Sequence, residues 1–317
     1  MILKMIRRDY ADSSPAISGL RPRGLAAVLM LIVLSTLISS CEKNVTVKIP
    51  ETEDEIVVEG YIETGTHPYV ILSKSLPFFG TININNFIQR TIPGAVVTVD
   101  NGTFTDTLAQ VISGYGIYST LQMSGENGKS YKLKVEINGK TLTAVTTIPM
   151  PVSPDSVWFK VDGHKDSLGF VWAHLTDPDT LGNCYRWSAR RINRYTFGLQ
   201  IGQQKDSAFI APLGSVFDDK FINNKSFDFD FPRGNDPNSK KEDDDNDEKF
   251  YFKKGDTIIV KFSSIDRDHF EFWRSEETQV NNNGNPFGSP APVIGNINGA
   301  LGIWGGYGNT FDTVYAH

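Results

Sequence analysis

The stretch YKLKVEI, from Tyr131 to Ile137, alternates apolar and charged side chains along its whole length. A period of two places the apolar residues on one face of a β-strand and the charged residues on the other. Asn138 and Gly139 follow, and this pair favours a two-residue hairpin turn because both central positions of a type I′ turn need a positive φ. The sequence therefore predicts an antiparallel hairpin whose second strand covers 140–147.

The register of this hairpin supports the prediction. A two-residue loop pairs Val135 with Leu142 and Leu133 with Ala144, so apolar side chains face one another across the two strands. Other short alternating segments, separated by turn residues, follow the same pattern, which is typical of β-sandwiches. Before Pro149 the other predicted strands are 56–62, 69–72, 95–99, 103–108 and 116–121.

Three prolines, Pro149, Pro151 and Pro154, mark a predicted boundary between two domains. Proline fixes φ and cannot donate to a strand ladder, so this segment cannot be a central strand. The segments PGAVVTV (93–99), GIY (116–118) and GKSYKL (128–133) resemble immunoglobulin-like folds of the carboxypeptidase-regulatory type. We therefore expect a mainly β protein with two β-sandwich, immunoglobulin-like domains over 56–149 and 150–317.

The second half is predicted to contain further strands and one short C-terminal helix. The strands are 156–161, 168–175, 185–193 and 257–264, and Phe227, Phe229 and Phe231 alternate with acidic residues as in an edge strand. Asp266 is a suitable N-cap for a helix from Arg267 to about Val280. Phe270, Trp273 and Val280 lie on one stripe of this helix and are expected to pack on the sheet.

Two segments of the second half depart from the strand pattern. Residues 232–249 contain a run of Lys, Asp and Glu that has no apolar side chain to bury, which predicts a mobile acidic loop. This run also lacks the glycine and the alternating ligands of a calcium loop. The tail over 281–307 is rich in Asn, Gly and Pro and is expected to be ordered but irregular chain.

The N-terminus has the features of an export signal. Residues 25–38 carry no charge, Arg21 and Arg23 precede them, and the apolar run is too short for a typical transmembrane helix. The segment ISSC, ending at Cys41, resembles the lipobox of bacterial lipoproteins, in which the cysteine carries the lipid. The sequence thus predicts a signal peptide over 1–40, lipidation at Cys41 and a polar tether over 41–55.

Composition and motifs argue against several function classes. The net charge of −6 is unsuited to a nucleic-acid partner, which needs a basic face. The sequence has neither a G-x-S-x-G elbow nor an H-E-x-x-H motif, and its five histidines do not have the spacing of metal ligands. Cys184 is left without an intrachain disulfide partner and is expected to be buried and inert. We therefore expect no enzymatic activity, no metal site and no cofactor.

One short pattern occurs more often than composition predicts. Asp followed by Ser or Thr and then by Ala, Ile, Leu or Val occurs seven times. One interpretation is structural: Asp ends a turn and Ser or Thr opens a strand. The other is that the triplet resembles the O-glycosylation acceptor of exported Bacteroidota proteins, and both can hold. The candidate acceptors are Thr107, Ser156, Ser167, Thr180, Ser207, Thr257 and Thr313.

The chain as a whole resembles the Bacteroidota lipoprotein family known as domain of unknown function 4249. The resemblance rests on Cys41, the segment TIP at 147–149, DP at 177–178 before CYR at 184–186, and FEFW at 270–273. Its most specific part is NINGALGIWGGY at 296–307, where family members often have Gly in place of Ala300 and Phe in place of Trp304. The resemblance implies an outer-membrane lipoprotein encoded near a TonB-dependent transporter, on the cell surface or the periplasmic face. It implies no activity.

Two functions remain open at this point. The first is a lipid-anchored accessory or binding subunit of a TonB-dependent transporter in nutrient uptake. The alternative is an independent cell-surface adhesin or glycan-binding β-sandwich. In the tail, Phe287, Trp304 and Tyr307 are expected either to close the core of the second domain or to form a partner-docking surface, since aromatic residues dominate interface hot spots.

Overall fold

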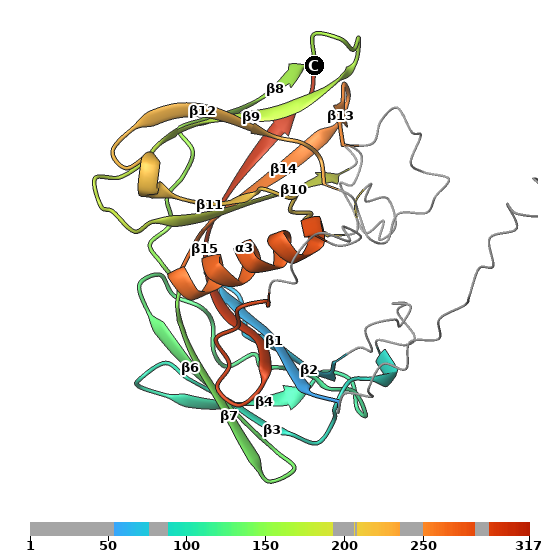
Figure 1. Ribbon diagram of the computed structural model, residues 1–317, viewed down its shortest axis with the longest axis vertical. Coiled ribbons are helices and arrows are strands. Elements are labelled where there is room, and N and C mark those ends of the chain that lie inside the picture. Colours follow the sequence, from blue (N-terminus) through green and yellow to red (C-terminus); the bar gives the residue numbers. More distant parts are fainter. Residues whose placement is uncertain (1–53, 76–87, 193–205, 207, 235–249, 283–291) are drawn as a thin grey trace, which may run out of the picture. The chain divides into compact units, whose positions relative to one another are not determined.

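The computed structural model describes residues 54–75, 88–192, 206, 208–234, 250–282 and 292–317 (Figure 1). Residues Thr52–His317 form one compact unit. The predicted signal peptide, Cys41, nearly all of the tether and the acidic run from 235 to 249 lie outside the described residues. Within the described part, no helix is both long and apolar enough to cross a membrane.

The protein is mainly β, as predicted, and most of its strands belong to one sheet of eleven strands. The order in this sheet is β11-β10-β14-β15-β1-β2-β5-β4-β3-β6-β7. Its strands are β1 (Ile56–Glu63), β2 (Tyr69–Lys74), β3 (Val96–Asp100), β4 (Thr105–Gln110), β5 (Ile117–Ser119), β6 (Ser130–Ile137), β7 (Lys140–Thr147), β10 (Cys184–Ile192), β11 (Val216–Asp218), β14 (Thr257–Ile265) and β15 (Leu301–Tyr315).

A second sheet has four strands, with β9 at its centre. Strand β8 pairs along one side of β9, and β12 and β13 pair along the other side. The strands are β8 (Ser156–Val161), β9 (Leu168–Thr176), β12 (Ser226–Phe231) and β13 (Phe252–Lys253). A 3-10 helix, η1 (Asp219–Phe221), lies between β11 and β12 in the chain.

The hairpin that the sequence predicts is present with its predicted register. Strand β6 pairs with β7, with Val135 opposite Leu142 and Leu133 opposite Ala144. Asn138 and Gly139 have φ values of 49° and 74°, as a type I′ turn requires. Along β6 the side chains alternate between exposed and buried, so one face of the hairpin belongs to a core.

The predicted helix is also present, as α3 (Arg267–Asn282). Asp266 caps it, because its Oδ1 accepts a hydrogen bond of 2.9 Å from the backbone N–H of His269. Phe270 is buried as expected, but the prediction for Val280 is wrong, since this side chain is 45% exposed. The packed stripe of the helix therefore ends before its last turn.

The two halves of the chain have separate hydrophobic cores. The first contains Val58, Leu72, Val97, Leu133 and other side chains of β1 to β7. The second lies between β10 and β14 of the large sheet and the inner face of β9 and β12, with Trp187 and Phe262 among its largest members. Apolar faces of two sheets thus pack on each other in the second half, as in a sandwich.

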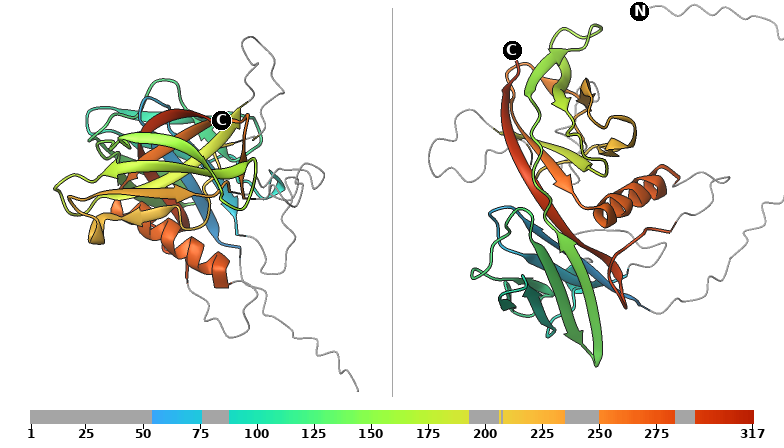
Figure 2. Two further views of the ribbon diagram at one scale, coloured as in Figure 1. Left: turned by 90° about the horizontal axis from the view of Figure 1, so that it is seen from above. Right: turned by 90° about the vertical axis from the view of Figure 1, so that its left-hand side faces the viewer.

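Strand β15 links these two cores, which the sequence did not predict. It pairs in parallel with β1 through Leu301–Tyr307 and antiparallel with β14 through Tyr307–Tyr315. Figure 2 shows this strand in red, passing from beside β1 to beside β14. The expectation of irregular chain is therefore wrong from Leu301 onward. The division at 149/150 into two immunoglobulin-like domains stays a prediction. Strand β15 contributes side chains to the cores on both sides of this division.

Glycine explains why this strand was hard to predict. Gly302 has a φ of +112°, and a Cβ there would lie 1.9 Å from the carbonyl oxygen of Val58 on β1. The strand can therefore approach β1 only where it carries no side chain. In a sequence, a glycine such as Gly302 is typical of a loop and not of a strand.

Candidate functional site

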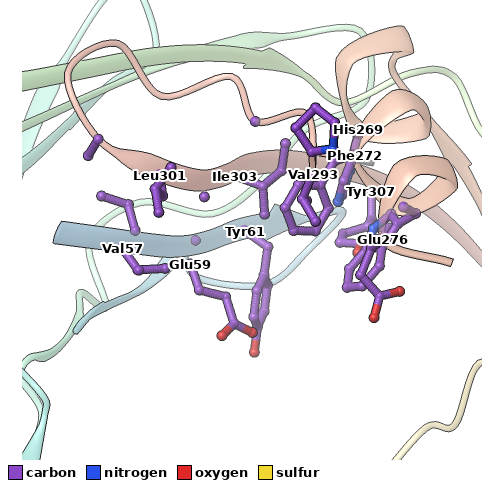
Figure 3. A pocket seen from close by; sticks show the side chains of 17 residues that line it. Val57, Glu59, Tyr61, His269, Phe272, Glu276, Val293, Leu301, Ile303 and Tyr307 are labelled. Atoms are coloured by element: carbon purple, nitrogen blue, oxygen red, sulfur yellow. The ribbon is translucent and has the colours of Figure 1, made fainter. Parts of the chain in front are cut away.

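A cavity of about 630 Å³ lies between β1, the start of β15 and α3 (Figure 3). This volume is within the range of small-molecule sites, roughly 300–1,000 Å³. Most of its wall is apolar and includes Val57, Phe272, Val293, Leu301 and Ile303. Polar side chains from β1 and α3, those of Glu59, Tyr61 and Glu276, also line the cavity.

The helix that forms one wall is held in place by a small core of its own. Phe270 of α3 packs with Cys184 of β10, Ile265 of β14 and Tyr307 of β15. Phe270 and Trp273 are three residues apart and therefore lie on the same side of the helix. This packing fixes Phe272, Trp273 and Glu276 beside the strands rather than leaving them in solvent.

The floor of the cavity follows from the pairing of β1 with β15. Val57, Glu59 and Tyr61 alternate along β1 and therefore point to the same face. In the parallel register they lie opposite Leu301, Ile303 and Gly305. Two polar side chains, the carboxyl group of Glu59 and the hydroxyl-bearing ring of Tyr61, thus project from a floor that is otherwise apolar.

Beside this floor, His269 lines the cavity and packs directly on the backbone of β15. A Cβ on Gly305 would lie 2.2 Å from Cε1 of the imidazole, so the ring can occupy this place only beside a glycine. The His269 ring also meets the Tyr307 ring edge-on, with 4.4 Å between the centroids. Burial lowers the pKa of His269 to about 3, so the imidazole is neutral at physiological pH.

The polar groups next to the cavity are paired with one another. Arg186 donates a hydrogen bond of 2.8 Å to the hydroxyl of Tyr307, and its guanidinium lies 3.4 Å from the centroid of the Trp273 ring. Lys261 forms an ion pair of 2.6 Å with Glu63. These contacts hold the aromatic wall rigidly and leave neither cation among the lining side chains.

The open side of the cavity is acidic. Figure 3 shows the side chains of Glu59, Tyr61 and Glu276 pointing toward the same side. The apolar surroundings of Glu59 remove part of its hydration and raise the pKa of this carboxyl. Burial, with Glu63 nearby, raises the pKa of Tyr61 to about 12, so its hydroxyl keeps its proton.

Two of the three aromatic residues of the predicted docking surface, Trp304 and Tyr307, are buried. Trp304 is fully buried in the first core, where its Nε1–H donates a hydrogen bond of 3.0 Å to the Tyr131 carbonyl. It therefore closes the first core, not the second as expected, and offers nothing to a partner. Tyr307 is also buried and lies among the residues that line the cavity, and Phe287 lies outside the described residues.

The candidate O-glycosylation acceptors divide by exposure. Thr107, Ser156, Thr180 and Thr313 are exposed, Ser167 is half-buried, and Ser207 lies outside the described residues. Thr257 is only 4% exposed, so it is not accessible in the folded protein. Its neighbour Asp256 has a structural role before β14, because its Oδ2 accepts a hydrogen bond from the Lys253 backbone N–H. The turn-and-strand interpretation therefore accounts for the triplet at this position.

Cys184 agrees with the prediction from the sequence. Cys184 is buried, as predicted, and burial raises the pKa of its thiol to about 12, which opposes the reactive thiolate form. Among the described residues, no three His, Cys, Asp or Glu side chains are grouped so that they can hold a metal ion.

The sequence did not single out the cavity residues Glu59, Tyr61, His269 and Glu276. One signal was present: Glu59 is the only charged residue within the apolar strand segment IVVEGYI, from Ile56 to Ile62. A charge inside such a strand marks a face that is not part of the core. Nothing in the sequence indicated that α3 packs against this face.

One of the comparisons with known proteins found a match. A family model described as "Domain of unknown function (DUF4249)" matches residues 42–312. No match was found among curated proteins.

Proposed function

We propose, for a chain that belongs to the family of domain of unknown function 4249, that it is a lipid-anchored binding subunit that works with a TonB-dependent transporter at the outer membrane. The observation that carries the proposal is the cavity between β1, β15 and α3. Apolar walls with a few convergent polar groups are typical of a binding site for a small molecule. The proposal assigns the protein binding rather than catalysis.

The anchor gives this binding role its place. A lipid on Cys41 would hold the chain at the membrane, and the segment up to β1 would let the folded part reach a neighbouring transporter. Tethering two proteins to one surface raises their effective concentration, so even a weak contact is populated. This part of the proposal rests on the lipobox-like segment and on the family resemblance.

Co-purification from native membranes tests the association. The tagged full-length protein is extracted in a mild detergent and its partners are identified. We expect a TonB-dependent transporter to co-purify with the wild-type chain, and Cys41→Ala to lose both the acyl label and the transporter. Recovery of the wild-type chain without a transporter would contradict the association, and acyl labelling of the Cys41→Ala variant would contradict the anchor.

A second candidate function, binding of a surface glycan, is favoured by the outer face of the four-stranded sheet. On this face Trp158 of β8 pairs with Trp172 of β9, and their stacked rings lie 6.3 Å apart between centroids. Asp230 is opposite Trp172 on the other side, and His174 and Asp228, two residues along each strand, are joined by a hydrogen bond of 2.5 Å between Nδ1 and Oδ1. Flat aromatic rings beside carboxylates suit the apolar face and the hydroxyl groups of a sugar ring.

Affinity electrophoresis in polysaccharide gels tests this alternative. If it holds, the wild-type protein is retarded by at least one polysaccharide, and Trp158→Ala removes the retardation. Phe221→Ala is the matched control, because Phe221 is a 77% exposed aromatic side chain on η1, outside this sheet. Equal migration of both variants and the wild-type protein in all gels would contradict glycan binding at this face.

A further inference from the structure

We propose that the ligand of the cavity is an apolar molecule that carries a positively charged amine, held at the open side by Glu59 and Glu276. This inference rests on the proposed binding function and adds the chemical class of the ligand. Three observations support it: the charge of the lining, the neutral ring of His269 and the arrangement of the nearby cations.

The lining is acidic. It contains the carboxylates of Glu59 and Glu276, and among the described residues that line it there is no Lys or Arg. A negative lining with low-dielectric walls attracts cations and repels anions. Moreover, a carboxylate among apolar groups lacks part of its hydration, and an ammonium group can replace the lost water.

His269 borders the cavity without adding a positive charge. It is among the lining residues and is only 1% exposed. Burial lowers the pKa of its imidazole to about 3, so the ring is neutral at physiological pH and does not oppose a bound cation.

The nearby cations do not cancel this preference. Lys261 is paired with Glu63, which also accepts a hydrogen bond of 2.8 Å from Asn309. Arg186 is bonded to the Tyr307 hydroxyl, stacks on the Trp273 ring and is not among the lining residues, although its charge opposes part of the rise in the pKa of Glu59. The aromatic side chains of Tyr61, Phe272 and Trp273 remain on the cavity side, where their π faces favour an organic cation.

Calorimetry with three matched probes tests the proposal. The probes are phenylbutylamine, phenylbutanol and phenylbutanoate, which share one apolar body and differ in charge. Each is titrated into the full-length protein in nanodiscs, with empty nanodiscs as the reference. We expect the amine to bind about tenfold more tightly than the alcohol, since only the amine can form partly exposed ion pairs with the two carboxylates. The preference should weaken at high salt.

Variants separate the two levels of the proposal. Glu59→Gln with Glu276→Gln should abolish the difference between amine and alcohol, whereas Glu136→Gln, an exposed glutamate on β6, should leave it unchanged. If the amine and the alcohol bind equally to the wild-type protein, or if the carboxylate binds most tightly, the cationic ligand is overturned while the cavity stands.

A cavity-filling variant tests the binding site itself. Leu301→Trp places a larger side chain in the cavity and should weaken all three probes, whereas Leu121→Trp, at an 85% exposed position outside the lining, should not. If no probe binds the wild-type protein, or if Leu301→Trp changes no affinity, the proposed binding function of this cavity is overturned together with the ligand class.

Discussion

Trp304 is the largest side chain that β15 contributes to the first core. Its ring is fully buried, its Nε1–H donates to Tyr131, and its backbone N–H and carbonyl both bond to the Asn296 amide. We expect Trp304→Ala to lower the free energy of unfolding by about 3–5 kcal/mol, the usual cost of removing a buried aromatic side chain. Denaturant titration measures this loss. A change below about 1 kcal/mol would show that Trp304 does not fill the first core.

A second residue-scale prediction concerns His269 and pH. Its pKa is about 3 in the folded protein, below the 6.5 of an unperturbed imidazole, so the unfolded chain binds a proton first as the pH falls. The folded state is therefore destabilised progressively from about pH 6.5 downward, on the order of 3 kcal/mol by pH 4. In His269→Gln this part of the pH dependence is absent. Identical stability profiles of the two proteins between pH 7 and pH 4 would contradict a buried neutral imidazole.

At the scale of single elements, local sequence was sufficient wherever neighbours in the chain determine the structure. The β6–β7 hairpin follows from Asn138 and Gly139, and the start of α3 follows from Asp266. The start of β15 could not be predicted from local sequence, because its glycines are required by contacts with β1 and with α3, which lie elsewhere in the chain. Gly302 lies against Val58, and Gly305 against His269.

Replacement of glycine by alanine should therefore lower the free energy of unfolding by different amounts at two positions. Gly302→Ala should destabilise the protein strongly, by more than about 2 kcal/mol, because its φ is +112° and its Cβ would meet the backbone of β1. Gly163→Ala is the control, since a Cβ there meets nothing within 4 Å and its φ is ordinary. Comparable melting temperatures for the two variants would mean that β15 does not approach β1 in this way.

At the scale of the whole molecule, the sequence indicated the fold class and the two cores but not the link between them. Pairing of β1 with β15 joins residues near both ends of the folded unit, as with Val57 and Leu301. No local pattern encodes such a long-range contact. From the sequence alone, the proline-rich segment at 149–154 therefore indicates a boundary between two domains and gives no sign of a strand that contributes to both cores. The cavity was missed for the same reason, since it exists only where β1, β15 and α3 meet.

The shared strand predicts that the two halves depend on each other for stability. β15 supplies Trp304 to the first core and Val314 to the second, and it hydrogen-bonds to both β1 and β14. We therefore expect a single unfolding transition in denaturant, monitored both by tryptophan fluorescence, with Trp187 buried in the second core, and by far-UV circular dichroism. The fragment 54–153 lacks Trp304 and the neighbour strand of β1, so it should fail to fold when expressed alone. Two separate transitions, or a cooperative melt of that fragment, would show instead that the halves are independent domains and that β15 only docks onto the first.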